Sequence, residues 1–261
     1  MIESDLGEAI EVALPRGRAA VISRPRPGGG SPNQDAALIV EAESEEVLMA
    51  VADGMGGTRR GGEAAALTVR HLAVRAGAPM GDGSFRTAIL DGIESANRDL
   101  LANLPEGSTT LATVELAGHT VRPYHVGDSV ILVVGQRGRL KLLTVSHSPV
   151  GLGVEAGFLD EEEALHHHER HVVFNAVGSS GMRIELGAPL ELARRDTLLL
   201  ASDGLTDNLT IEEIVGTIRK GRLGRVVGEL ADRARERMLA PPTTLPSKPD
   251  DLTIIAYRRS V

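Results

Sequence analysis

Five aspartates stand next to apolar runs, where the end of a strand would fix the direction of each carboxylate. Asp53 and Asp203 directly follow apolar runs, Asp35 and Asp250 lie just before such runs, and Asp128 sits in a Gly-Asp-Ser turn between two of them. A single Asp-Gly pair is most simply explained as a turn. Five aspartates beside apolar runs, two of them followed by glycine, favour a common site instead. Carboxylates gathered at one end of a sheet repel one another unless a cation lies between them. Hard oxygen ligands suit Mg²⁺ or Mn²⁺ better than zinc, so the pattern predicts a divalent metal site.

Glycines follow the first of these frames in the segment DGMGGTRRGG. Gly54, Gly56 and Gly57 would let the backbone turn sharply and approach an ion closely, which a Cβ would hinder. A dinucleotide-binding loop requires the spacing G-x-G-x-x-G, and Arg59 breaks that spacing here.

The elements expected to position these carboxylates are short strands and four helices. The strands are rich in Val, Ile and Leu and bounded by turn residues, and they are expected at 19–23, 36–40, 47–52, 110–116, 121–126, 130–134, 139–144, 197–201 and 252–257. Apolar residues at helical spacing predict helices at 62–76, 85–104, 211–219 and 226–239. This order lacks the strict strand-helix alternation of a parallel α/β fold and favours sheets covered by helices.

Composition excludes several classes of function. The chain has 261 residues, a net charge of −8 and no cysteine. An acidic protein binds nucleic acid and anionic membranes poorly, and the absence of cysteine excludes disulfides and a thiolate nucleophile. The first residues lack the plan of a signal peptide, and no run resembles a membrane span, so we expect a cytoplasmic protein.

Seven segments in order resemble the protein phosphatase 2C type of metal-dependent serine/threonine phosphatase, in its bacterial form. They are NQDA, VADGMGGTRRGGEAA, GSTTLATVEL, HVGDSVILV, LTVSHSP, LLLASDGLTDNLT and DDLTII, and they span nearly the whole chain. The resemblance implies an α+β fold, a four-layer sandwich in which two antiparallel sheets are flanked by helices. It also implies a single catalytic domain over residues 1–261, with a flap at about 151–171.

The resemblance further implies roles for individual residues. Asp53 would bridge two metal ions, Gly54 would ligate one of them through its carbonyl, Asp203 and Asp250 would complete the other site, and Asp35 would hold metal-bound water. Asp128 lies where bacterial relatives place a third, weaker ion. Asp35, Asp53, Asp203 and Asp250 are the expected catalytic residues.

The expected cofactor is a pair of Mn²⁺ or Mg²⁺ ions with room for a third. A hydroxide bridging the metals would attack the phosphorus of phosphoserine or phosphothreonine. The expected partner is a phosphorylated protein, opposite a serine/threonine kinase, and the expected state is a monomer.

Several positions depart from the family pattern, among them Ser146, which stands where an aspartate is usual and is expected to be structural. Gly30 stands where an arginine usually grips the substrate phosphate, and Arg24 or Arg26 is a candidate to replace it. Met55 stands where eukaryotic members have a histidine that protonates the leaving group, which leaves the general acid open. Asp251 stands where an asparagine is usual.

Other polar residues have simpler explanations than a functional role. The runs 161–163 and His166–His168 are most simply solvated surface, and His147 is expected to pack in a loop. Two alternatives to a general phosphatase stay open. One is a regulatory phosphatase that acts on a phosphorylated switch protein. The other is a pseudophosphatase without turnover, which Gly30 favours and the retained aspartates disfavour.

Overall fold

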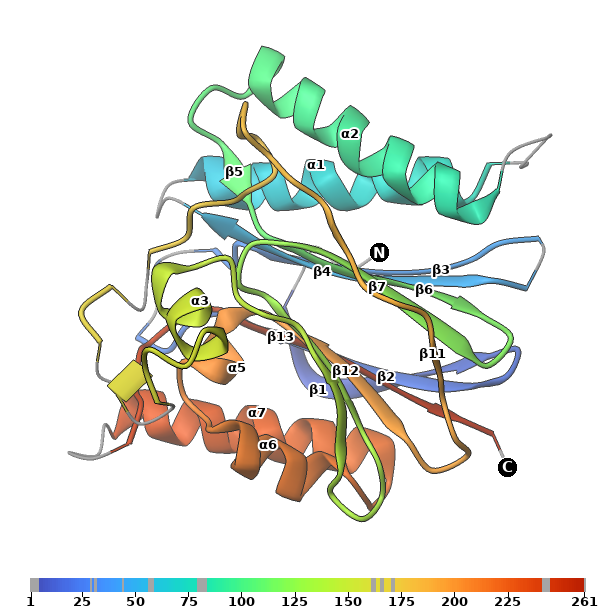
Figure 1. Ribbon diagram of the computed structural model, residues 1–261, viewed down its shortest axis with the longest axis vertical. Helices are drawn as coiled ribbons and strands as arrows, with labels where there is room; N and C mark the ends of the chain where they lie inside the picture. The colour runs from blue at the N-terminus through green and yellow to red at the C-terminus, as the bar shows by residue number, and fades with distance from the viewer. Residues whose placement is uncertain are drawn as a thin grey trace.

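The computed structural model describes residues 5–28, 30, 32–43, 45–55, 59–78, 84–160, 163–164, 167–169, 172–240 and 245–260. Within these ranges two antiparallel sheets stack face to face, with α1 and α2 covering one sheet and α6 and α7 covering the other (Figure 1). The predicted α+β sandwich of four layers is therefore confirmed.

The first sheet has the strand order β1-β2-β13-β12-β8-β9. Its strands are β1 (Leu6–Leu14), β2 (Gly17–Arg24), β13 (Leu252–Arg259), β12 (Thr197–Ala201), β8 (Val130–Val134) and β9 (Leu140–Leu143). The central strands β8 and β12 are buried along their whole length, which matches their unbroken aliphatic sequences. Because neighbouring strands run antiparallel, the start of β8, the end of β12 and the start of β13 lie at the same end of the sheet.

The second sheet has the order β10-β7-β6-β4-β3, with β11 also paired to β7 and β5 to β4. Its strands are β3 (Asp35–Glu41), β4 (Val47–Met55), β5 (Ser108–Thr109), β6 (Leu111–Ala117), β7 (Thr120–Val126), β10 (Glu185–Leu186) and β11 (Leu190–Glu191). The hairpin of β3 and β4 delivers two of the predicted site residues, because each strand has an aspartate at the same end.

The helices are α1 (Arg59–Ala76), α2 (Phe85–Asn103), α3 (Pro149–Glu155), α5 (Asp203–Thr206), α6 (Ile211–Ile218) and α7 (Leu223–Leu239). The long helices bury aliphatic stripes on their sheets, and a third aliphatic cluster fills the space between the two sheets. Side-chain caps fix helix starts: Ser84 accepts from the backbone N–H of Thr87, and Thr210 forms a capping box with Glu213.

The four predicted helices correspond to α1, α2, α6 and α7 to within a few residues at each end, whereas the short helices α3 and α5 were not predicted. Two other features differ from expectation. The strand β1 was not predicted, because its alternation is weak and most of its side chains are exposed or half-buried. The segment expected to be a flap contains the end of the short helix α3, and its division from the rest of the domain stays a prediction.

None of the helices in the described residues combines the length and the apolar character needed to cross a bilayer.

Candidate metal centre

The hairpin of β3 and β4 sets two carboxylates opposite each other, since Asp35 and Asp53 are partners in its register. Like charges in such a pair repel. Burial and then neighbouring carboxylates, Asp203 first, hold the pKa of Asp53 well above its usual range. Burial also raises the pKa of Asp35 to about 7, although hydrogen bonds from Ser202 and Thr253 oppose the shift. The protein thus holds two acids side by side where charge is unfavourable without a cation.

The other carboxylates come from the first sheet, at the end where β12 finishes and β8 and β13 begin. Asp203 begins α5 directly after β12, Asp250 lies just before β13, and Asp128 lies in the turn before β8. Burial raises the pKa of Asp203 well above its usual range and that of Asp128 to about 6, and for both the next cause is Asp207. Asp207 lies four residues after Asp203 and just past α5.

Hydrogen bonds of small polar residues fix the positions of these carboxylates. The buried Ser202 hydroxyl donates to Asp35 Oδ2 at 2.7 Å and accepts from the Thr253 N–H at 2.9 Å. The Thr110 hydroxyl bonds that of Ser129 at 2.6 Å and lies 3.3 Å from the Asp53 N–H that donates to it. Through Thr110, these two contacts together join the end of β4 to the turn that carries Asp128.

Gly54 lies where two backbone segments approach each other closely. A Cβ built on it would lie 2.3 Å from the Gly61 carbonyl carbon and 2.7 Å from the Gln34 oxygen. A side chain at this position would push α1 away from β4. Glycine therefore fixes the approach of the helix to the strand end beside Asp53.

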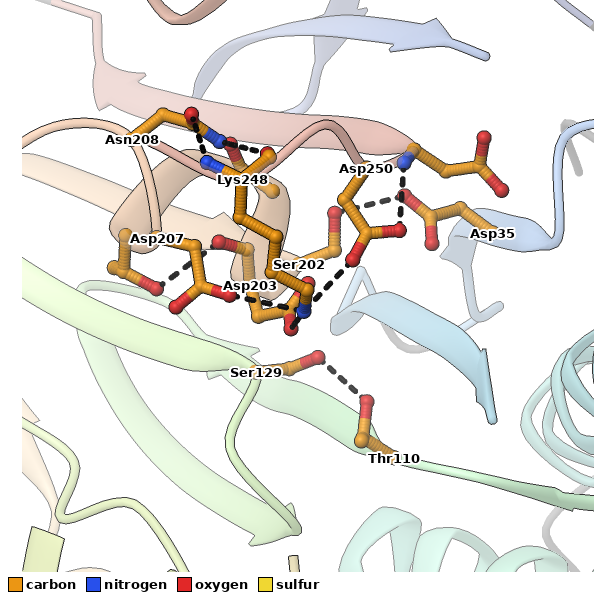
Figure 2. A network of polar contacts seen from close by, with 12 residues as sticks. Asp35, Thr110, Ser129, Ser202, Asp203, Asp207, Asn208, Lys248 and Asp250 are labelled. Atoms are coloured by element: carbon orange, nitrogen blue, oxygen red, sulfur yellow. Dashed lines mark hydrogen bonds and ion pairs between the residues drawn. The ribbon is translucent and has the colours of Figure 1, made fainter. Parts of the chain in front are cut away.

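A lysine, which the sequence did not single out, lies among the carboxylates. Lys248 Nζ is 2.8 Å from Asp203 Oδ2, 2.8 Å from Asp250 Oδ2 and 2.9 Å from Asp207 Oδ2 (Figure 2). Burial alone would lower the pKa of Lys248, but the three carboxylates outweigh burial and hold it above its usual range. The ammonium is therefore present, and it neutralises part of the cluster.

Asp251 anchors the loop on the other side of the site. Its two carboxylate oxygens accept from the backbone N–H of Arg26 and of Gln34, each at 2.8 Å. Both hydrogen bonds lower its pKa, but burial is the larger effect, so the pKa of Asp251 lies above its usual value. An asparagine has one acceptor oxygen, so this aspartate is the better anchor for two backbone donors.

The two arginines that were candidates for phosphate binding differ in position. Arg24 donates to the Gly7 carbonyl at 2.8 Å and pairs with Asp232 of α7 at 2.7 Å. Arg26 lines the cavity that Asp53 and Asp203 also line. Gly30 does not line that cavity, and its φ of 101° lies in the left-handed region, where an arginine would be strained.

A histidine pair beside Asp128 has a structural explanation. His125, His147 and Glu185 are close enough to share an ion. His147 Nδ1, however, accepts from the Gly127 N–H at 3.0 Å, so its Nε2 carries the proton and donates to Glu185 at 3.0 Å. His147 is buried and fixes the Gly127 turn, where φ is 102°. The expected loop-packing role of His147 fits this geometry.

The carboxylates line a cavity of about 260 Å³ that suits a divalent cation. Among the predicted ligands, its lining includes Asp53, Gly54, Asp128, Asp203 and Asp250. Asp35 is buried and lines a separate cavity. Asp35 Oδ1 and Asp203 Oδ1 are buried without a hydrogen-bond partner, which is costly unless a cation or water binds them. Donor chemistry and geometry therefore fit a hard metal ion.

All six residues predicted as metal ligands thus come from the same end of the sandwich, while their roles as ligands stay predictions. Gly56, Gly57 and His166 lie outside the described residues. Sequence reasoning missed Asp207 and Lys248. The spacing of Asp203 and Asp207 was a usable signal, because residues four apart on a helix share a face. The position of Lys248 in a proline-rich loop gave no such signal.

Comparisons with known proteins identify the family of this fold. The family model for protein phosphatase 2C matches residues 26–238. The serine/threonine phosphatase stp of Listeria monocytogenes is 30% identical over 210 residues, which are 77% of this chain and 81% of the relative. The structure of the S. agalactiae serine/threonine phosphatase has a TM-score of 0.79 at 29% identity and covers 93% of this chain and 99% of its own. The catalytic domain of the phosphatase PstP in complex with two manganese ions has a TM-score of 0.74 at 25% identity, over 93% of this chain and 98% of its own.

Proposed function

We propose, from the premise that this chain belongs to the protein phosphatase 2C family and is a protein serine/threonine phosphatase, that Asp53, Asp203 and Asp250 hold a pair of Mn²⁺ or Mg²⁺ ions for catalysis. The observation that carries the proposal is the convergence of carboxylates with raised pKa values and unpartnered buried oxygens in one cavity. The binding of two manganese ions by the related PstP domain supports it.

When bound, two divalent cations acidify a water and offset charge on the phosphoryl oxygens. The residues of this chain supply the rest. Asp53 and Gly54 at the end of β4, together with Asp203 and Asp250, would hold the ions on rigid strand ends. Asp35 lies beside Asp53, with one oxygen bound by Ser202 and the other unpartnered, and it is proposed to hold metal-bound water. Asp128 is proposed for a third, weaker ion.

The proposed substrate is a phosphorylated protein, so that the chain would reverse the action of a serine/threonine kinase. Residues 1–261 are proposed to form one catalytic domain with a flap at about 151–171. A monomer and a cytoplasmic location also stay predictions.

We expect the metal-loaded chain to hydrolyse a phosphothreonine peptide and p-nitrophenyl phosphate in Mn²⁺. Release of inorganic phosphate from the peptide measures this directly. The control is the same peptide with phosphotyrosine, which should react more slowly. A folded, Mn²⁺-binding chain that releases no phosphate from either substrate would identify a pseudophosphatase.

Arg26 is the expected phosphate-binding residue, because it lines the cavity and its backbone is fixed by Asp251. A charge-assisted hydrogen bond contributes about 1.5–3 kcal/mol, so Arg26→Ala should raise KM for the phosphothreonine peptide about tenfold or more. Arg26→Lys should recover part of the loss, because it keeps the charge without the planar fork.

Arg24→Ala is the matched control, since Arg24 pairs with Asp232, and it should leave KM unchanged. Gly30→Arg should also leave KM unchanged, because residue 30 is outside the lining and in a strained conformation. If Arg26→Ala keeps the wild-type KM, phosphate capture depends on the metals alone.

A further inference from the structure

The ammonium of Lys248 occupies a cation position inside the proposed metal site. Its three contacts with Asp203, Asp207 and Asp250 are between 2.8 and 2.9 Å (Figure 2). An ammonium has three N–H donors, so these carboxylates can engage all of them. Two of the three, Asp203 and Asp250, are proposed ligands of the metal pair.

The backbone of Lys248 is fixed by a buried asparagine. The Lys248 N–H donates to Asn208 Oδ1 at 2.9 Å, and Asn208 Nδ2 donates to the Lys248 carbonyl at 2.8 Å. Asn208 is fully buried, and Pro249 disfavours a helical conformation of the residue before it. These contacts therefore fix the backbone from which the Lys248 side chain reaches the carboxylates.

The Lys248 side chain can nevertheless leave the carboxylate cluster. It is 27% exposed, which exceeds the 16% of Asp203 and the 17% of Asp207. A lysine stem is flexible, so the ammonium can swing into solvent while the backbone hydrogen bonds to Asn208 stay intact.

Lys248 and a metal ion compete for the same oxygens. Asp203 Oδ2 and Asp250 Oδ2 are already bound to the ammonium, and two cations at contact distance repel each other strongly in a partly buried site. The ion proposed for Asp53 and Gly54 does not need these two oxygens, so it can bind while Lys248 stays in place. The second ion requires Asp250 and meets the ammonium.

We propose that Lys248 is a tethered competitor of the second divalent cation. It holds Asp203, Asp207 and Asp250 together in the metal-free protein and leaves when the second ion binds. The inference rests on the proposed metal pair. A position that an internal group occupies nine-tenths of the time binds its ligand about tenfold more weakly. The consequence is a chain whose first ion binds tightly and whose second ion binds weakly, so that full loading follows the free metal concentration.

The test is calorimetric titration of metal-stripped protein with Mn²⁺, in wild type, Lys248→Met and Lys141→Met. Lys248→Met should bind the second Mn²⁺ at least about tenfold more tightly than wild type, and its melting temperature in EDTA should fall. Lys141 is the matched control, because its side chain is also 27% exposed and pairs with the buried Asp196 at 2.6 Å outside the site. Lys141→Met should titrate like wild type.

If Lys248→Met binds the second ion as tightly as wild type or more weakly, the inference is overturned, but the proposed metal pair is not contradicted. No Mn²⁺ uptake by either protein overturns the proposed function and the inference with it. If Lys248→Met fails to fold, acylation of wild-type lysines measured by mass spectrometry decides, with the exposed Lys220 as the internal reference. Lys248 should be protected without metal and react several-fold faster in saturating Mn²⁺, and protection that persists in Mn²⁺ overturns the inference.

Discussion

Asp53→Asn should reduce kcat by about a thousandfold or more while the fold stays intact. Metal-ion catalysis supplies several kcal/mol of transition-state stabilisation, and each ~1.4 kcal/mol is a factor of ten in rate. Asparagine keeps the shape of Asp53 but removes the charge that the two proposed ions share. The measurement is kcat for a phosphothreonine peptide in saturating Mn²⁺, with circular dichroism as the check on folding.

The stability of the metal-free variant adds a second readout. Burial and four neighbouring carboxylates disfavour the Asp53 charge, so Asp53→Asn should melt in EDTA at the wild-type temperature or above it. Asp91→Asn is the control. Asp91 is exposed on α2, so this substitution also removes one charge, but away from the cavity. Near-normal turnover in Asp53→Asn would mean that the metal pair does not depend on the end of β4.

Removal of metal by EDTA should abolish turnover, and excess Mn²⁺ should restore it. Among the described residues that line the cavity there is no cysteine, serine or histidine that would act as nucleophile without metal. Mn²⁺ should also stabilise the fold, because it binds the native cluster and not the unfolded chain. At about 100 times Kd this is worth ~2.7 kcal/mol, which corresponds to a rise of roughly 5–10 °C in melting temperature for a chain of this size.

The pH dependence of stability in EDTA tests the same cluster. The pKa is raised to about 7 for Asp35 and to about 6 for Asp128, so the folded chain keeps protons that the unfolded chain releases at lower pH. Stability contributed by these groups is complete below about pH 4 and is lost as pH rises toward 7. Saturating Mn²⁺ should remove this contribution. Unchanged turnover in EDTA, or equal pH profiles with and without Mn²⁺, would contradict the metal site.

Much of the fold was predictable because its signals are local. The helices α1, α2, α6 and α7 have apolar stripes at helical spacing, and β8 and β12 are unbroken aliphatic runs. The strand β1 was missed because an edge strand needs no buried face of its own and is held by its register with β2. Its sequence therefore carries little of the alternation that marks a half-buried strand.

The candidate site divides in the same way. Asp53 and Asp203 were predictable because Asp53 lies near the end of the buried strand β4 and Asp203 follows the buried strand β12, whose rigid backbones fix the two carboxylates. Lys248 was not, because its place among the aspartates depends on the fold of the loop around Asn208, 40 residues earlier in the chain. Arg26 and Arg24 were equivalent in sequence, and the structure separates them because Arg26 lines the cavity whereas Arg24 pairs with Asp232 of α7.

The place of β13 in the first sheet has a consequence for how the chain folds as it leaves the ribosome. β13 lies between β2 and β12, and it pairs with β2 along its full length from Leu252 to Arg259. During synthesis the inner edges of β2 and β12 lack their shared neighbour until nearly all of the preceding chain has been made. Pairings of such long sequence separation form slowly, and unpaired strand edges are prone to aggregation. The same late segment carries Asp250 and Asp251, so the nascent chain would complete the proposed metal site only in the step that closes its sheet.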